Sequence, residues 1–138
     1  MTDVFTLALA VGADNAYVGT VVKVHDGDTL NVSVVDALLS VPVVLAVRLA
    51  GVNAPELSEP GGKEVRDLLA AELPPGTVVT LRRVHPDKYA GRIVATVITQ
   101  AGLDVAFWLV DHGYGAPWSG VGIKPKVPWP PAASAGRW

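Results

Sequence analysis

The chain has 138 residues, which suits one domain, and half of them are hydrophobic. Its net charge of −2 excludes binding of nucleic acid through bulk positive charge, so any such chemistry needs a few local cations or a bound metal. The absence of cysteine excludes disulfides and thiolate metal sites. No apolar run reaches membrane-spanning length.

The first sixteen residues contain an apolar stretch but do not resemble a signal peptide. They lack a basic start, and Asp3 stands where such a peptide carries positive charge. We interpret residues 1–16 as an N-terminal arm or an extra strand. We therefore expect a cytoplasmic or phage-delivered protein rather than a secreted one.

The stretch VHDGDTLNV, residues 24–32, predicts a hairpin. Asp26-Gly27 between two apolar runs is a strong turn signal, because a tight hairpin turn favours residues that accept positive φ. Asp28 is not needed for the turn. In a strand with period two it shares the core-facing side of Leu30, so we expect it at the rim of the core or beside a partner.

Other segments alternate with period two or switch to the helical period of 3.6. The alternation predicts further strands over residues 43–52, 77–84 and 92–99. The helical period predicts a helix over residues 63–73 that ends at Pro74. A second predicted helix follows Asp104, a candidate N-cap, and ends at Gly113.

These elements predict an α+β fold that is mainly β. Five strands, a helix between the third and fourth, and a closing helix fit a five-stranded OB-type Greek-key barrel with two or three helices, because closure removes exposed strand edges. We assign the barrel to residues 17–118. The Pro-rich residues 119–138 are interpreted as an extended, weakly ordered tail that packs on its own domain or on a partner.

Charged and amide side chains cluster at the predicted strand ends. Arg48 interrupts an apolar strand among small neighbours, and Asn53 and Glu56 follow the end of that strand. Asn53 and Glu56, together with Asp26 and Asp28, supply only oxygen ligands, which favours a hard cation such as Ca²⁺ or Mg²⁺.

Two arginines have a matching chemistry. Arg48 and Arg92, which opens a later strand, are suited to a phosphate that bridges a cation and guanidinium groups. The alternative is that Arg48 only pairs with Asp28 in a structural ion pair. The pattern of residues leaves both interpretations open.

Three motifs in register resemble the staphylococcal nuclease (thermonuclease-like) family. They are DGDT at 26–29, RLAGVNAPE at 48–56 and DKYAGR at 87–92, and the resemblance covers roughly residues 17–118. It implies an OB-type barrel and Ca²⁺-dependent hydrolysis of phosphodiester bonds in DNA or RNA that leaves 3′-phosphates. The expected substrate is single-stranded or frayed, Mn²⁺ or Mg²⁺ are possible substitutes for Ca²⁺, and a monomer is expected.

The resemblance also implies roles for individual residues. Asp28, Asn53 and the Ala54 carbonyl match metal ligands, and Asp26 matches an acid that supports the metal through water. The remaining matches concern the substrate: Glu56 positions or deprotonates the attacking water, Arg48 and Arg92 bind phosphate, Tyr89 lies near a terminal phosphate, and Trp118 stacks on a base or packs in the core.

This sequence departs from the family motif at two positions. Asn53 stands where the family has Asp, which removes one negative charge but keeps an oxygen ligand. Ala90 is inserted in the family's Tyr-Gly-Arg motif, and a bulge at Gly91 would let Arg92 point inward. The rival hypotheses are an OB-type module that binds nucleic acid with little turnover and a purely structural barrel.

Overall fold

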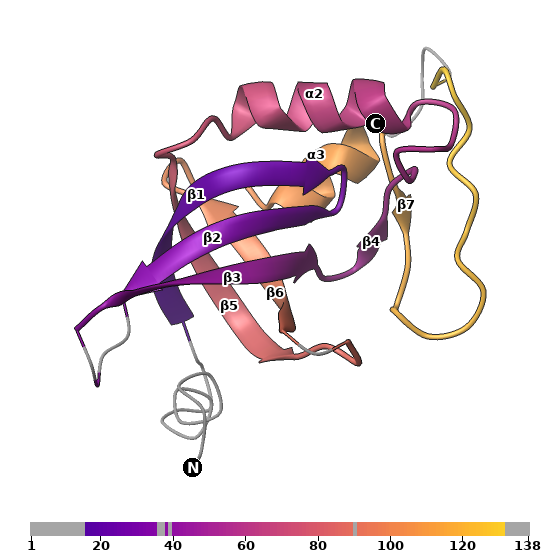
Figure 1. The fold of residues 1–138 in the computed structure, drawn as a ribbon. Helices are drawn as coiled ribbons and strands as arrows, with labels where there is room; N and C mark the ends of the chain where they lie inside the picture. Colours follow the sequence, from indigo (N-terminus) through magenta and orange to yellow (C-terminus); the bar gives the residue numbers. More distant parts are fainter. Residues whose placement is uncertain (1–15, 36–37, 39, 90, 132–138) are drawn as a thin grey trace.

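The computed structural model describes residues 16–35, 38, 40–89 and 91–131 (Figure 1). The expected arm over residues 1–16 lies outside this description except for Ala16, where the first strand begins. The described elements, in chain order, are β1 (Ala16–Asp26), β2 (Thr29–Val35), β3 (Pro42–Leu49), β4 (Val52–Asn53), α2 (Gly62–Glu72), β5 (Val78–Pro86), β6 (Arg92–Thr99), α3 (Val105–Asp111) and β7 (Ala116–Pro117).

Five strands close into a barrel in the order β1-β2-β3-β6-β5, with β5 pairing back to β1. All neighbours are antiparallel except β3 and β6, which are parallel because the chain crosses over through α2 and β5 between them. The short strands β4 and β7 form a separate antiparallel pair beside the barrel (Figure 1). The predicted five-stranded OB-type barrel is confirmed, and the described residues form two helices.

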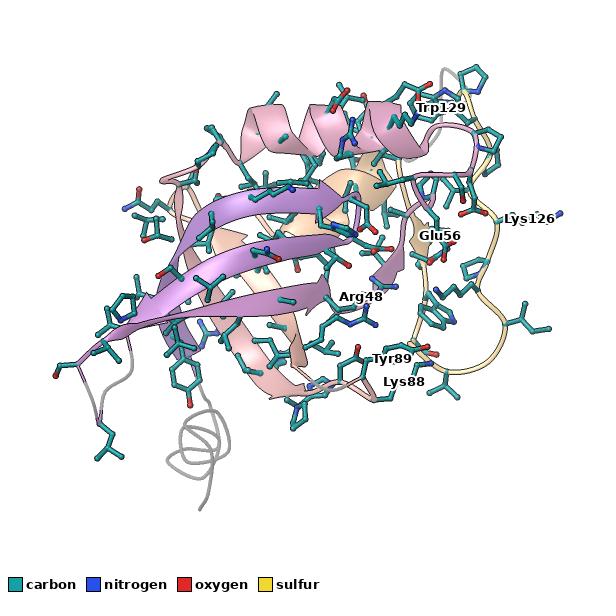
Figure 2. All side chains as sticks on the ribbon, viewed as in Figure 1. Arg48, Glu56, Lys88, Tyr89, Lys126 and Trp129 are labelled. Atoms are coloured by element: carbon teal, nitrogen blue, oxygen red, sulfur yellow. The ribbon has the colours of Figure 1, made fainter. Side chains whose placement is uncertain are left out.

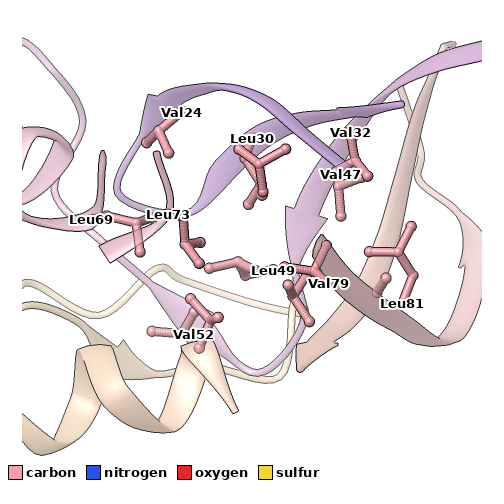
Figure 3. Packing of buried hydrophobic residues seen from close by; sticks show 14 of the residues in the cluster. Val24, Leu30, Val32, Val47, Leu49, Val52, Leu69, Leu73, Val79 and Leu81 are labelled. Atoms are coloured by element: carbon pink, nitrogen blue, oxygen red, sulfur yellow. The ribbon is translucent and has the colours of Figure 1, made fainter. Parts of the chain in front are cut away.

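The interior is filled by aliphatic side chains that alternate along the strands. Leu30 and Val32 of β2 are fully buried, as the period-two pattern predicted, and Leu30 lies beside its register partner Val47 on the neighbouring strand β3 (Figure 3). Helix α2 lies across one end of the barrel, where Val65 and Leu69 are fully buried (Figure 1), and the remaining buried apolar side chains complete the cluster.

Both predicted helices form where the helical period occurs. Helix α3 is capped as expected, because the Asp104 side chain accepts hydrogen bonds from the backbone N–H groups of Ala106 and Phe107. Gly113, with φ of 76°, ends it. In the part of the chain that the structure describes, no helix is long and apolar enough to cross a membrane.

The β1–β2 hairpin forms, but its turn differs from the prediction. Asp26 pairs with Thr29, so Gly27 and Asp28 are the two loop residues, and Gly27 does not adopt positive φ. Glycine is required there for space: a Cβ on Gly27 would lie 2.7 Å from both Ala54 Cβ and Val65 Cγ1. Packing against α2 and the β4 loop explains this glycine better than turn geometry does.

Candidate active site

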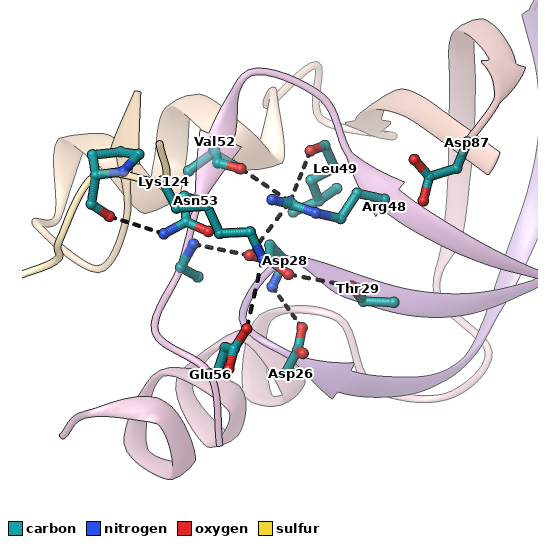
Figure 4. Close-up of polar contacts among 12 residues, drawn as sticks. Asp26, Asp28, Thr29, Arg48, Leu49, Val52, Asn53, Glu56, Asp87 and Lys124 are labelled. Atoms are coloured by element: carbon teal, nitrogen blue, oxygen red, sulfur yellow. Dashed lines mark hydrogen bonds and ion pairs between the residues drawn. The ribbon is translucent and has the colours of Figure 1, made fainter. Parts of the chain in front are cut away.

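Asp28 and Arg48 meet at one end of the barrel, where β2 begins and β3 ends (Figure 4). Thr29 and Arg48 are register partners, so Asp28 lies diagonally opposite the arginine. Arg48 Nη1 is 3.3 Å from Asp28 Oδ2, and both side chains are buried, with exposed fractions of 9% and 12%. The alternative predicted for Arg48, an ion pair with Asp28, is therefore present.

Only one nitrogen of the guanidinium is used for this pair. Arg48 Nη1 also donates to the carbonyls of Leu49 at 3.2 Å and Val52 at 2.9 Å. Among the described residues, Nε and Nη2 have no hydrogen-bond partner, although the Arg48 side chain is 9% exposed. A buried guanidinium with unpaired N–H groups is able to accept an additional anion.

Asp28 is held in an environment that disfavours its charge. Burial raises its pKa to about 6, the positive charge of Arg48 opposes that rise, and the nearby carboxylate of Asp26 adds to it. Its oxygens accept hydrogen bonds from the Thr29 hydroxyl at 3.2 Å and from the Ala54 N–H at 2.9 Å. Added positive charge at this position would favour the ionised carboxylate.

Asp26 shapes the loop that presents Asp28. Its Oδ1 accepts a hydrogen bond from the Asp28 N–H at 3.1 Å, which forms an Asx-turn. The side chain is half-buried. The two aspartates predicted to act together are therefore adjacent.

Asn53 and Ala54 leave the barrel beside this pair. The short strand β4 pairs with β7 and brings the Ala54 N–H onto Asp28. Asn53 is buried, with 6% exposure, and its Nδ2 donates to the carbonyl of Pro125 at 3.0 Å. Its amide is thus oriented by a residue that is distant in sequence.

Glu56 lies on the turn between β4 and α2, and its side chain is 62% exposed. Its carbonyl accepts the Glu59 N–H at 2.9 Å, and the turn packs so closely on α2 that a Cβ on Gly62 would lie 1.9 Å from this oxygen. Glu56 Oε1 is 3.6 Å from Lys124 Nζ (Figure 4 labels both). The carboxylate is accessible to water, as a base that activates water requires.

Arg92 and Tyr89 form a second group on the β5–β6 connection. Arg92 Nε bonds to the carboxylate of Asp87, and its guanidinium carbon lies 4.8 Å from the centre of the Tyr89 ring. Burial alone would raise the pKa of Asp87, but the hydrogen bond and charge of Arg92 hold it below its usual value. Among the described contacts, none joins Arg92 to Asp28, Arg48 or Glu56. The inserted Ala90 lies outside the described residues.

Trp118 covers the buried arginine. Its ring centre is 5.6 Å from Arg48 Cζ and 5.8 Å from Lys124 Nζ, so two cations lie near one aromatic ring. The ring is partly exposed at the edge of the site. The sequence analysis included Trp118 among the site residues, but it assigned Lys124 to the tail. It did not identify Asp87 as the partner of Arg92; the opposite charges five residues apart were the signal for this pair.

Comparison with known protein families places this chain in one of them. The model of the family described as staphylococcal nuclease homologue matches residues 46–120, which include Arg48, Asn53, Glu56 and Arg92. The chain belongs to the staphylococcal nuclease homologue family. Endonuclease YhcR of Bacillus subtilis (strain 168) is 32% identical over 117 residues, which cover 74% of this chain and 9% of that much longer relative.

The oxygen donors of this family member suit a hard divalent cation. Carboxylate, amide and peptide oxygens are the ligands that Ca²⁺ prefers, and the Asp28 carboxylate, whose pKa is raised, would be stabilised by such a charge. In the described part of the chain, no three His, Cys, Asp or Glu side chains are arranged to hold a metal. Asp28 instead pairs with Arg48, and Glu56 with Lys124, so the chain's own cations balance its acids.

Proposed function

We propose that this chain is a metal-dependent nuclease that hydrolyses phosphodiester bonds of DNA or RNA and leaves 3′-phosphates. The observation that carries the proposal is Arg48: it is buried and fixed through Nη1, and its remaining N–H groups have no partner among the described residues. A phosphate oxygen satisfies those groups, and each charge-assisted hydrogen bond contributes about 1.5–3 kcal/mol. Membership of the nuclease family supports the same reaction.

In the proposed reaction, Arg48 and Arg92 bind the scissile phosphate. Glu56 orients a water molecule and takes its proton as the water oxygen attacks phosphorus. The bond from phosphorus to the 5′ oxygen breaks, that oxygen takes a proton from solvent water, and the phosphate remains on the 3′ side. Arg92 reaches the phosphate by exchanging its bond with Asp87, and the half-exposed position of the arginine permits this exchange.

The residues proposed to hold a cation are Asp28, Asn53 and the Ala54 carbonyl, with Asp26 acting through water. Ca²⁺ is the proposed ion, and Mg²⁺ or Mn²⁺ are substitutes with the same preference for oxygen. Bound there, a divalent ion polarises the phosphate and offsets the charge that develops at phosphorus. With Asp28 on such an ion, Arg48 would keep its bonds to the carbonyls of Leu49 and Val52 and would offer its remaining N–H groups to the phosphate.

The proposed substrate is a single strand or a frayed end, with Tyr89 near its terminal phosphate and Trp118 against a base. Both rings are at least partly exposed, and aromatic faces bind unpaired bases of any sequence. We also propose that the protein acts as a monomer.

A second candidate is an OB-type module that binds nucleic acid with little turnover. Asn53 favours it, because its amide oxygen is neutral and is therefore a weaker ligand for a hard cation than a carboxylate, while its Nδ2 is used to hold Pro125. Digestion of an end-labelled single-stranded oligonucleotide, in Ca²⁺ and in chelator, separates the candidates. Cleavage that occurs in Ca²⁺ but not in chelator, with 3′-phosphate ends, supports the nuclease. Binding without cleavage supports the module. If the protein neither binds nor cleaves the oligonucleotide, the structural barrel is the remaining interpretation.

A further inference from the structure

The residues that follow β7 return to the barrel beside the candidate active site. At one end the Trp118 N–H donates to the Gly51 carbonyl at 3.0 Å. At the other end the Trp129 ring packs against the core, with its centre 6.1 Å from that of Tyr114. Residues 118–131, called here the C-terminal segment, are therefore attached to the domain at both ends (Figure 2).

Asn53 attaches the middle of the C-terminal segment. Its Nδ2 donates to the Pro125 carbonyl at 3.0 Å, and the asparagine is buried. The aspartate that the family motif has at this position lacks an N–H, and its carboxylate would face the carbonyl oxygen without a proton between them. Asn at position 53 therefore gives the C-terminal segment a hydrogen bond that Asp could not give.

This attachment determines where Lys124 lies. Lys124 precedes the anchored Pro125, and its Nζ is 3.6 Å from Glu56 Oε1 and 5.8 Å from the centre of the Trp118 ring. The Lys124 side chain is 51% exposed and that of Glu56 is 62% exposed. An ion pair this exposed contributes little stability, so the phosphate of a bound strand can readily take the place of the Glu56 carboxylate beside the Lys124 ammonium.

We propose that Lys124 is a substrate-binding residue: the C-terminal segment, attached through Asn53, holds its ammonium against a phosphate of the bound strand next to the scissile one. The proposal rests on the proposed function. Trp118 lies near both Arg48 and Lys124, so a base stacked on its ring has a guanidinium and an ammonium available for its flanking phosphates.

Lys126 provides a matched control two residues further along. It is exposed, no described contact involves it, and Figure 2 shows its side chain directed away from the barrel and from Glu56. Lys124→Met and Lys126→Met therefore remove the same charge from the same segment and differ only in which side of it the charge lies on.

The test measures binding and turnover separately. Binding of a labelled oligothymidylate is measured by anisotropy in chelator at several salt concentrations, and kcat and KM are measured in Ca²⁺. A single-strand phosphate contact contributes about 0.7 to the slope of log affinity against log salt. We expect Lys124→Met to lower that slope by about this amount, to weaken binding about threefold to tenfold, and to raise KM more than it lowers kcat. Lys126→Met should match the native protein.

The outcomes separate this proposal from the one it rests on. Equal salt slopes and equal KM values for the two lysine variants overturn the role of Lys124 while leaving the nuclease intact. A native protein that cleaves nothing in Ca²⁺ overturns the proposed function instead. If Lys124→Met releases the C-terminal segment, its tryptic cleavage after Lys126 accelerates, and a structural role replaces the proposed one. Lys124→Arg, which keeps the charge, should recover binding.

Discussion

The ion pair between Asp28 and Arg48 is compatible with both interpretations that the sequence left open. Period two predicts Asp28 on the core-facing side shared with Leu30; the structure places it in the loop just before β2, and the β2–β3 register brings Arg48 diagonally opposite. The pair uses only Nη1 of the guanidinium. Arg48 thus balances a buried carboxylate in the free protein while Nε and Nη2, which have no described partner, stay available for an anion.

Arg92 is the better residue for testing phosphate binding by mutation. Its side chain is 28% exposed and its described side-chain contacts are with Asp87 and Tyr89, but its removal leaves the Asp87 carboxylate, which is 12% exposed, without this partner, so Arg92→Ala should lower the free energy of unfolding by about 1–3 kcal/mol. We expect cleavage to fall at least about tenfold, because a charge-assisted contact is lost. Lys126→Ala, which removes an exposed cation that no described contact involves, is the control. Unchanged cleavage in Arg92→Ala would mean that the arginine lies outside the site.

Asp28 should make the metal-free protein sensitive to pH. Burial raises its pKa from 3.8 to about 6, so between these values the folded state binds a proton that the unfolded state releases. The stability from this group is therefore fully present below about pH 4 and is lost as the pH rises through about 6.

The measurement is the melting temperature of native protein and of Asp28→Asn in chelator, from pH 4 to pH 7. We expect the native protein to lose stability relative to the variant by at most roughly 3 kcal/mol over this range. Saturating Ca²⁺ should reduce the loss, since the bound ion favours the ionised carboxylate. A difference that stays constant with pH would show that Asp28 ionises normally.

At the scale of elements, the β1–β2 hairpin is tied to the helix that covers the barrel end. Gly27 has no room for a Cβ between Ala54 and Val65, so Gly27→Ala should lower the free energy of unfolding by about 1–3 kcal/mol. In a Val65→Ala background the same substitution should be less harmful, because one of the two contacts is removed. Denaturant unfolding of the four proteins measures this coupling. Additive effects would show that turn conformation, rather than packing, requires the glycine.

The elements most completely predicted are those with local signals. Alternation gave β6 with its observed bounds, and Asp104 marked the start of α3 through its own side chain. The observed loop residues of the hairpin, Gly27 and Asp28, lie one residue later than the predicted turn at Asp26-Gly27. The prediction explains Gly27 by backbone conformation, whereas the space left by α2 and Ala54 requires the glycine. The C-terminal segment carried no local signal for its contacts: Asn53 and Pro125 are 72 residues apart, and only the folded barrel brings them together.

For the whole molecule, the acidic net charge is compatible with nucleic-acid binding because the charges at the site nearly cancel. Asp26, Asp28 and Glu56 carry negative charge, and the chain supplies Arg48 and Lys124 within 4 Å of two of them. Binding a divalent ion would make the site net positive. These residues come from the β1–β2 hairpin, from β3 and from the segments after β4 and β7, so the balance depends on barrel closure.

Asn53→Asp separates cation binding, which would use the side-chain oxygen, from attachment of the C-terminal segment, which uses Nδ2. The aspartate adds an anionic ligand, so Ca²⁺ affinity should rise by about 1–3 kcal/mol, roughly tenfold to a hundredfold. It also loses the N–H that donates to Pro125, so trypsin should cleave faster after Lys126. The metal-free variant should melt below the native protein, and Ca²⁺ should restore more of its stability.

Asn53→Ala, which loses both functions, should show the faster proteolysis without the tighter Ca²⁺ binding. The measurements are Ca²⁺ titrations of cleavage and melting temperature together with mass spectrometry of the tryptic fragments. An unchanged half-saturation in Asn53→Asp would place this side chain away from the cation and leave attachment of the C-terminal segment as its role.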